Sequence, residues 1–257
     1  MKGKIFSSLE FLLRYKYTMI TPIIFLAGWE ILTSYFKVPF YILPPLSEIF
    51  KELLNPSLHW PIHIKATLYE VLLGFILAVV LGIFLAIIIE WSDALRQMIL
   101  PWLVFINTLP KVAVAPLFLV WFGYGTLPTT LLTFLICFFP ITINTATGLE
   151  RVDPELIDLL RSLRATKSQI FVKIRLPNSL PMIISGLKVS STMAVIGAII
   201  GEFIASSEGL GYLIVTAQIS VSTDVIFAAI IYISVMGLCF FGIVVVIEKI
   251  LSYMHKI

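Results

Sequence analysis

Between Lys111 and Glu150 the chain reads VAVAPLFLVWFGYGTLPTTLLTFLICFFPITINTATGL, a run without a single charged side chain. As one helix this run would be about 55–60 Å long at 1.5 Å per residue, almost twice the thickness of the hydrocarbon core of a membrane. It must therefore fold back on itself. Two glycines and a proline between Phe122 and Pro128 predict the turn, so the run belongs to two membrane spans.

The composition of the whole chain also indicates a membrane protein. Of the 257 residues, 59% are hydrophobic and 13% are charged, whereas soluble domains carry about a quarter charged residues. Two further runs, Val71 to Ile89 and Val225 to Ile247, are uncharged and long enough to cross a membrane, since a span takes about 20 helical residues. Met19 to Phe36 and Pro181 to Ala205 are apolar with a few charged side chains. We predict one all-α transmembrane domain over 1–257, with six helices at about 18–36, 70–90, 99–122, 128–149, 181–205 and 224–248.

The N-terminus, the cysteines and the histidines give little sign of special chemistry. The first apolar stretch is long and no small-residue cleavage pattern follows it, so a cleaved signal peptide is not expected. Cys137 and Cys239 fall inside predicted spans, which argues against a disulfide framework. His59 and His63 are one helical turn apart, as zinc ligands sometimes are. We prefer to interpret them as interfacial histidines on a short helix outside the membrane, and no metal site is expected.

The lysines and arginines predict the orientation of the spans. Of the 18, fourteen lie before the first span, in the second-to-third connection, in or beside the fourth-to-fifth connection, or after the last span. Three lie in the other connections, and Lys111 lies within the third span. Because cytoplasmic loops carry the excess of positive residues, both termini and the connection 150–178 are expected in the cytoplasm.

The connection 150–178 is the one sizeable hydrophilic block, with ten charged residues among 29. Asp153-Pro154 predicts an N-cap followed by proline at the first helical position. Thr166 to Gln169 has the pattern of a capping box. Apolar residues recur at helical spacing after each start, which predicts two short amphipathic helices joined by a bend near Arg164-Ala165 and ended by Pro177. Two interpretations are open: a connection lying on the membrane surface, or a docking element for a cytoplasmic partner.

The same segment resembles the "EAA" coupling segment of permease subunits in binding-protein-dependent ABC importers. That pattern is Glu-Ala-Ala, three residues, Gly, nine residues, and Ile-x-Leu-Pro. Here Asp158-Leu159-Leu160 stands at its start, Arg164 at the glycine position and Ile174-Arg175-Leu176-Pro177 at its end. The spacing is kept in full while the front half differs. Arginine in place of glycine costs about 1 kcal/mol if its φ angle is positive.

Short motifs in the order found in the nitrate/sulfonate/taurine branch of these permeases extend the resemblance from Gly28 to Glu248. They are Trp29-Glu30, Val38-Pro39-Phe40, Leu43-Pro44-Pro45, Thr108-Leu109-Pro110-Lys111-Val112-Ala113, Trp121-Phe122-Gly123, Phe139-Pro140, Val152-Asp153-Pro154-Glu155-Leu156 and Gly209-Leu210-Gly211-Tyr212.

The resemblance implies the permease subunit of an ATP-driven importer in a bacterial cell membrane, with the type I importer fold. It implies a homodimer in membrane lipid, two ATP-binding cassette ATPase subunits and an extracytoplasmic substrate-binding protein, and no nucleic acid. ATP and Mg would be used by the ATPase, with no cofactor bound by this chain, which has no Gly-x-x-x-x-Gly-Lys-Ser/Thr motif and is not expected to be an enzyme. The residues implied in ATPase coupling are Asp153, Pro154, Asp158, Leu159, Leu160, Arg161, Leu163, Arg164, Ala165 and Phe171.

Polar residues within the predicted spans are candidates for the translocation path, because such residues usually face the bundle interior or a water-filled pathway. The candidates are Asn107, Thr108, Lys111, Asn144 and Glu202. For Glu202 and for Glu30 we prefer the alternative, a structural pairing or an interfacial position. Gly197 to Gly201 is a small-residue pattern and is expected to pack helices closely.

Two other classes of function are weighed. A secondary transporter predicts inverted repeats and paired intramembrane carboxylates, and neither is visible in the sequence. A membrane-embedded enzyme needs a cluster of His, Cys, Asp or Ser groups within the membrane, and none is visible. The substrate stays open: the branch suggests nitrate, taurine or alkanesulfonates, whereas the span around Gly201-Glu202-Phe203 is closer to members assigned to aromatic acids or to heterocyclic vitamin precursors such as a pyrimidine or flavin.

Overall fold

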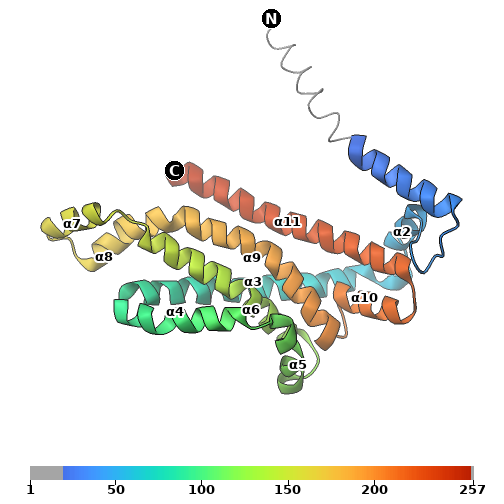
Figure 1. Ribbon diagram of the computed structural model, residues 1–257, viewed down its shortest axis with the longest axis horizontal. Coiled ribbons are helices and arrows are strands. Elements are labelled where there is room, and N and C mark those ends of the chain that lie inside the picture. The colour runs from blue at the N-terminus through green and yellow to red at the C-terminus, as the bar shows by residue number, and fades with distance from the viewer. Residues whose placement is uncertain (1–19, 256–257) are drawn as a thin grey trace, which may run out of the picture. The chain divides into compact units, whose positions relative to one another are not determined.

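The computed structural model describes residues 20–255, which form helices and turns and contain no strand (Figure 1). The elements are the helix Ile20–Tyr35, α2 Leu46–Leu53, the 3-10 turn η1 Pro56–Leu58, α3 Trp60–Trp91, α4 Asp93–Thr108, α5 Lys111–Phe122, α6 Thr126–Glu150, α7 Pro154–Ser162, α8 Lys167–Ile170, the π-helical turn η2 Phe171–Arg175, α9 Leu176–Ala205, α10 Leu210–Ile219 and α11 Thr223–His255.

The chain divides into two compact units, and the smaller one comprises the described residues up to His59 together with Thr216–Ile230. Within it, the indole Nε1 of Trp29 donates a hydrogen bond to Pro44 O (3.1 Å), and the ring packs edge-on against Phe227. The carboxylate of Glu30 accepts hydrogen bonds from Ser47 N and Ser47 Oγ. These contacts tie the helix Ile20–Tyr35 to the start of α2.

The larger unit, Trp60–Val215 with Ile231 onward, is built on three long helices, α3, α6 and α9, which pack against one another. Helix α3 is apolar on every side, so no amphipathic face orients it. It carries instead a stripe of small residues four positions apart, all buried: Gly74, Ala78, Gly82 and Ala86. Helices surrounded by lipid gain little from burying apolar surface and associate through such close van der Waals contact.

Helices α6 and α9 also approach each other closely. A Cβ atom added at Gly197 or Gly201 would lie 2.9 or 2.8 Å from the Cα atoms of Thr133 and Thr129, respectively. Further along, Ser190 Oγ donates to Cys137 O (3.0 Å), and Cys137 Sγ donates to Ser190 O (3.3 Å). The packing role expected for Gly197 to Gly201 is confirmed.

Four described helices are long and apolar enough to cross a membrane: α3, α6, α8 through α9, and α11. Helices α4 and α5 pass the same test together, as one span bent by 91°. The described part of the first expected span, Ile20–Tyr35, is shorter. Four or five of the six expected spans are therefore supported by length and composition within residues 20–255.

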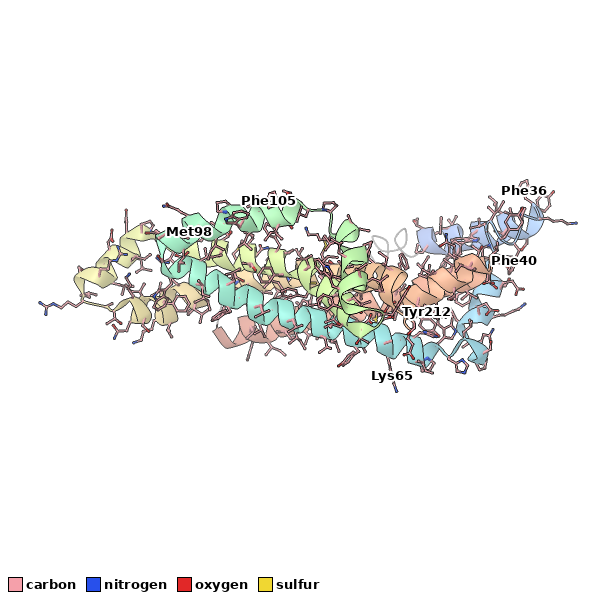
Figure 2. The ribbon with its side chains drawn as sticks, turned by 90° about the horizontal axis from the view of Figure 1, so that it is seen from below. Phe36, Phe40, Lys65, Met98, Phe105 and Tyr212 are labelled. Atoms are coloured by element: carbon pink, nitrogen blue, oxygen red, sulfur yellow. The ribbon has the colours of Figure 1, made fainter. Side chains whose placement is uncertain are left out.

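The apolar face of α4 is largely uncovered in this single chain. Met98 and Phe105 project from it, away from the neighbouring helices (Figure 2), and they are 67% and 56% exposed. Trp102, on the same helix, is 67% exposed. A membrane protein can leave such a surface to lipid or to a second subunit.

The third span, expected over 99–122, consists of two helices, α4 and α5, which pass the test for a span only when taken together. The chain breaks at Leu109, whose backbone is extended (φ −64°, ψ 133°), and α5 begins only after Pro110. A residue before proline is pushed out of the helical region by the proline ring, and proline itself offers no N–H for the helix. The two effects together account for the break.

Two helix boundaries also differ from expectation. Helix α3 begins at Trp60, ten residues before the predicted start, so Glu70 lies inside it. Pro177 was expected to end a helix, but α8, η2 and α9 run on as one span, Lys167–Ala205. Pro177 stands in the first turn of α9, where its missing N–H is tolerated, and the π-helical turn just before it shifts the hydrogen-bond ladder.

The close α6–α9 contact generates a prediction. Gly201→Ala should destabilise the protein by about 1–3 kcal/mol, because the added methyl group would overlap the backbone of α6. Gly242→Ala on α11 is the matched control, since a Cβ there meets no atom within 4 Å and alanine favours a helix. Thermal unfolding in detergent or lipid nanodiscs measures both variants. Equal stability of the two would contradict the packing account.

Candidate functional site

Helix α7 begins as the sequence predicts. The side chain of Asp153 accepts a hydrogen bond from Glu155 N (2.9 Å), and Pro154 occupies the first helical position. The aspartate satisfies one of the N–H groups that every helix start leaves unpaired, and the proline has no N–H to satisfy. The coupling segment, which we define as Asp153–Pro177, therefore starts at a fixed point.

The bend between α7 and α8 is a Schellman motif with arginine in the position that favours glycine. Ala165 N donates to Leu160 O (3.0 Å), and Arg164 N donates to Arg161 O (2.9 Å). Arg164 has a φ angle of 59°, in the left-handed region. The glycine of the related motif is thus explained by backbone geometry: it stands at the left-handed residue that closes the helix. Here Arg164 takes up that conformation at a cost of about 1 kcal/mol.

Helix α8 starts with the predicted capping box. Gln169 N donates to Thr166 Oγ1 (3.2 Å), and the Gln169 side chain accepts a hydrogen bond from Thr166 N (2.8 Å). Each partner satisfies a donor of the other. A helix as short as Lys167–Ile170 gains most from such a cap, because it has few internal hydrogen bonds of its own.

The coupling segment has a hydrophobic cluster of its own. Val152, Ile157 and Ile170 are buried together, and Leu160, Ala165 and Ile174 pack against them. Leu160 therefore faces inward, whereas Leu159 and Leu163 are 57% and 70% exposed. Leu160 and Leu163 are both among the residues implied in ATPase coupling, but their exposure differs. The structure separates them because Leu160 shares its helix face with Ile157, three residues before it.

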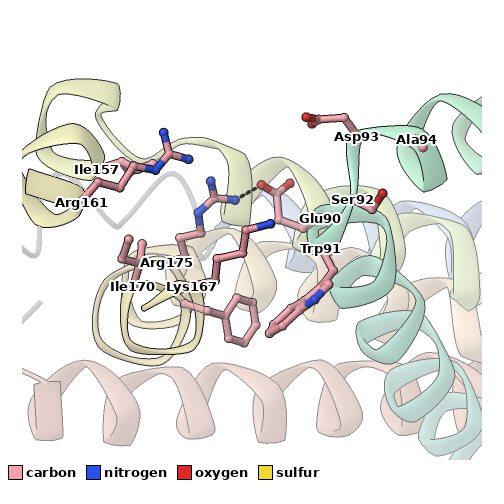
Figure 3. Close-up of a pocket in the computed structure, with 11 residues that line it drawn as sticks. Glu90, Trp91, Ser92, Asp93, Ala94, Ile157, Arg161, Lys167, Ile170 and Arg175 are labelled. Atoms are coloured by element: carbon pink, nitrogen blue, oxygen red, sulfur yellow. Dashed lines mark hydrogen bonds and ion pairs between the residues drawn. The ribbon is translucent and has the colours of Figure 1, made fainter. Parts of the chain in front are cut away.

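A cavity of about 470 Å³ lies between this segment and the connection from α3 to α4 (Figure 3). Ile157 and Arg161 of α7 line it, as do residues of α8 and η2, and the opposite wall is Glu90 to Ala94. Arg175 forms an ion pair with Glu90 within it (Figure 3). Phe171 packs edge-on against Trp91, with ring centroids 5.9 Å apart.

The ion pair at Glu90 is part of a network that joins four elements. Arg96 of α4 lies 3.9 Å from the Glu90 carboxylate and also pairs with Glu150 at the end of α6. The side chain of Glu90 is 9% exposed, so its pairing is shielded from solvent more than a surface salt bridge is. The network connects the coupling segment, through Arg175, to the ends of α3, α4 and α6.

The remaining predicted coupling residues lie on the surface of α7 and the bend. Asp158 pairs with Arg161 over one helical turn (3.2 Å), and both side chains are exposed. Arg164 is exposed at the bend and Ala165 is half-buried. The segment therefore presents exposed leucines and charged side chains on a frame that is capped, internally packed and tied to the bundle. Such a frame can carry a displacement to the spans without unfolding.

The predicted path residues do not form a single group. Asn107, Thr108 and Lys111 lie together at the α4–α5 bend, where Lys111 Nζ donates to Asn107 O (2.8 Å) and Asn107 Oδ1 (2.6 Å). Asn144 of α6 donates to Pro140 O (2.8 Å). Glu202 of α9 is 1% exposed. Their role in a path stays a prediction.

Glu202 lies against a second buried carboxylate, Glu70 of α3, which is 0% exposed. The sequence interpretation missed this residue because it treated Glu70 as the flank of an uncharged run. The expectation that paired intramembrane carboxylates are missing is therefore wrong. One signal was available: continuing the helix backwards from Val71 places Thr67 and Glu70 on one face, three residues apart.

The fold and the coupling segment together define a class, the membrane-embedded subunits of transport systems. The chain belongs to the family of binding-protein-dependent transport system inner membrane components, which it matches over residues 78–253. It is an importer permease of the ABC type, as the sequence resemblance indicated. The family is a transport family and not one of enzymes.

Named relatives agree with this assignment. The formylaminopyrimidine transport permease protein ThiX of Halalkalibacterium halodurans is 34% identical over 229 residues, 89% of this chain and 91% of ThiX. The putative aliphatic sulfonates transport permease protein SsuC of Bacillus subtilis is 33% identical over 85% of this chain and 80% of its own length. The inward-facing MetNI methionine ABC transporter has a chain with a TM-score of 0.58 and 18% identity, covering 74% of this chain and 97% of that one, which shows a shared fold.

The left-handed Arg164 generates a prediction about local stability. Arg164→Gly should stabilise the bend by about 1 kcal/mol, because glycine adopts a positive φ without the clash that Cβ causes. Amide hydrogen exchange at residues 160–165 should then slow by about fivefold in the isolated permease. Arg164→Ala is the control: it removes the guanidinium but keeps Cβ, so exchange should stay near the native rate. Equal slowing in both variants would show that the side-chain charge, and not φ, causes the strain.

Proposed function

We propose that this permease is driven by ATP-hydrolysing subunits that dock on the coupling segment. The observation that carries the proposal is the exposure of Leu159 and Leu163 on a helix pair that is otherwise capped and packed. Apolar side chains that remain exposed on an ordered element outside the spans are typical of a protein interface. The alternative, a connection resting on the lipid surface, would use the same leucines as lipid contacts.

The energetics favour a protein partner with an apolar groove. Burying one leucine side chain contributes about 1.5–3 kcal/mol, so Leu159 and Leu163 supply the centre of a small interface. Asp158, Arg161 and Arg164 surround them, and charges in such a position steer association more than they add affinity.

The network around Glu90 provides the route by which closure of the ATPase would reach the spans. A shift of α7 and α8 moves Arg175, and with it the ends of α3, α4 and α6 that share the ion pairs. Ion pairs and packed helices transmit rigid-body displacement when the element that moves is itself rigid. Switching of the bundle between inward- and outward-facing states follows from this motion.

The assembly we propose has two copies of this permease, two ATPase subunits and an extracytoplasmic binding protein. The family description, a component of a binding-protein-dependent system, supports the binding protein. The uncovered face of α4 supports a second membrane subunit. ATP and Mg would be bound by the ATPase.

For the substrate we propose a small polar organic solute, with a pyrimidine vitamin precursor as the first candidate. ThiX, with 34% identity, supports the pyrimidine, and SsuC, with 33%, supports a sulfonate. Uptake of radiolabelled formylaminopyrimidine and of an alkanesulfonate, in cells with and without this permease, distinguishes them. Permease-dependent uptake of the pyrimidine alone is expected. Uptake of the sulfonate alone would move the permease to the other substrate class.

The docking proposal predicts the effect of charge at the exposed leucines. Leu163→Glu and Leu159→Glu should each weaken ATPase binding by about tenfold or more, because a carboxylate would replace a buried apolar anchor. The permease should stay folded, since both positions are exposed. Co-purification of the ATPase subunit and solute uptake are the measurements.

Two further variants make the test specific. Leu54→Glu places the same charge at an 83% exposed leucine outside the coupling segment and should leave ATPase binding intact. Leu160→Ala should instead loosen the segment itself, because Leu160 packs on its internal cluster. If both glutamate variants at 159 and 163 bind the ATPase and transport normally, the segment is only a surface connection.

A further inference from the structure

The start of α10 is held by side chains from two other helices. Gly209 N donates to His63 Nδ1 (3.0 Å) and Leu210 N donates to Thr67 Oγ1 (2.8 Å), both acceptors being on α3. Gly211 N donates to Glu202 Oε2 of α9 (2.5 Å). A helix start leaves its first N–H groups without intrahelical partners, and here three successive ones find partners in the bundle. The Gly209–Gly211 turn is thereby fixed to α3 and α9.

The carboxyl groups of Glu70 and Glu202 lie against each other, and that of Glu202 lies against this turn. They are 0% and 1% exposed, and each is in contact with the other. Three of their four oxygens, Glu70 Oε1, Glu70 Oε2 and Glu202 Oε1, have no hydrogen-bond donor. Buried carboxylate oxygens without donors are costly, and two carboxylates in contact repel each other.

The neighbouring hydroxyl groups, Thr67 Oγ1 beside Glu202 and Thr129 Oγ1 beside Glu70, each also have a backbone carbonyl acceptor within their own helix. Thr67 Oγ1 lies 3.1 Å from His63 O, and Thr129 Oγ1 lies 2.8 Å from Thr126 O. Each hydroxyl has one hydrogen to donate. Whichever acceptor each hydroxyl takes, the contact between the two carboxyl groups has a hydrogen of its own only if one of them carries a proton.

The surroundings indicate which carboxyl group carries the proton. Glu202 accepts the N–H of Gly211 and faces the start of α10, and both favour a negative charge there. Glu70 has neither. A proton on Glu70 allows its hydroxyl to donate to Glu202 Oε1, which removes the repulsion and satisfies an oxygen that is otherwise unpaired.

We propose that Glu70 and Glu202 form a proton-binding site in which Glu70 donates its hydroxyl hydrogen to the Glu202 carboxylate, and that the protonated pair positions the first turn of α10. The ligand is a single proton. A metal cation is the competing occupant of two facing carboxylates, but the positive end of α10 opposes a cation at this place. His63 contributes in its neutral form, because only an unprotonated Nδ1 can accept the N–H of Gly209. Tyr212, stacked on His63, completes the surroundings.

The proton can be observed by infrared spectroscopy of the purified permease in lipid nanodiscs at neutral pH. A protonated carboxyl group absorbs at a frequency distinct from that of a carboxylate. The native protein should show this absorption and Glu70→Gln should lose it. Glu30→Gln is the matched control and should retain it, because Glu30 lies outside the carboxyl pair and accepts two hydrogen bonds from Ser47. Absence of the absorption from the native protein, or its persistence in Glu70→Gln, would overturn the proposal.

Thermal unfolding supplies an independent measurement. Glutamine can donate from its amide to Glu202 Oε1, so Glu70→Gln should unfold at the native temperature. Glu70→Ala removes the donor and leaves a cavity, so it should unfold at a lower temperature. A Glu70→Gln protein that fails to fold, or is as unstable as Glu70→Ala, contradicts the proposal. Stabilisation of the native protein, but not of Glu70→Gln, by added sodium or calcium would assign the pair to a cation instead.

Discussion

The structure depends on how closely α3 and α9 can approach α6. In a lipid environment the burial of apolar side chains gives little reason for two helices to associate, because lipid tails are as apolar as leucine. The helices must instead associate through close van der Waals packing of complementary surfaces. Gly74, Gly197 and Gly201 let the helices meet at distances that a larger side chain would prevent, and Gly82 adds a close contact with Ile141 and Thr142. Every feature that requires two helices to stay in fixed register, including the carboxyl pair and the ion-pair network, rests on this contact.

The coupling segment is stabilised differently, in the way that water-soluble proteins are. Val152, Ile157 and Ile170 form a small apolar cluster, capped helices surround it, and charged side chains cover the outside. The two kinds of structure meet at Glu90, where a nearly buried carboxylate receives Arg175 from the segment and lies near Arg96 from α4. Because the Glu90 side chain is largely buried, salt screens these ion pairs less than it screens pairs between exposed side chains.

Local structure such as helix caps and turns could be predicted from the sequence, whereas contacts between distant residues could not. Asp153, Pro154 and Thr166 act within one helical turn of themselves, so their capping roles could be predicted, as could the two glycines that end α5. The break at Pro110 is also local, but the 91° angle that follows depends on what α5 packs against. The inward face of Leu160 depends on Ile170, ten residues later.

Glu70 and Pro177 show why apolar runs alone mislead. Counting uncharged residues placed the start of the second span after Glu70, although the helix begins at Trp60 and buries this carboxylate against a residue 132 positions later. Pro177 was interpreted as a stop because proline cannot donate to a helix, yet a π-helical turn accommodates it. For Glu70 the partner, Glu202, lies far outside any short window of sequence, whereas for Pro177 the π-helical turn directly before it changes the hydrogen-bond pattern that a regular helix would require.

The unbroken span Lys167–Ala205 has a mechanical meaning. Its 39 residues correspond to a rod about 55–60 Å long, with the capping box at one tip and Glu202 three residues from the other. The π-helical turn Phe171–Arg175 lies near the α8 end of this rod. Under the proposed docking, a tilt of α8 would therefore displace this rod as a whole and reach Glu202, and through it the first turn of α10.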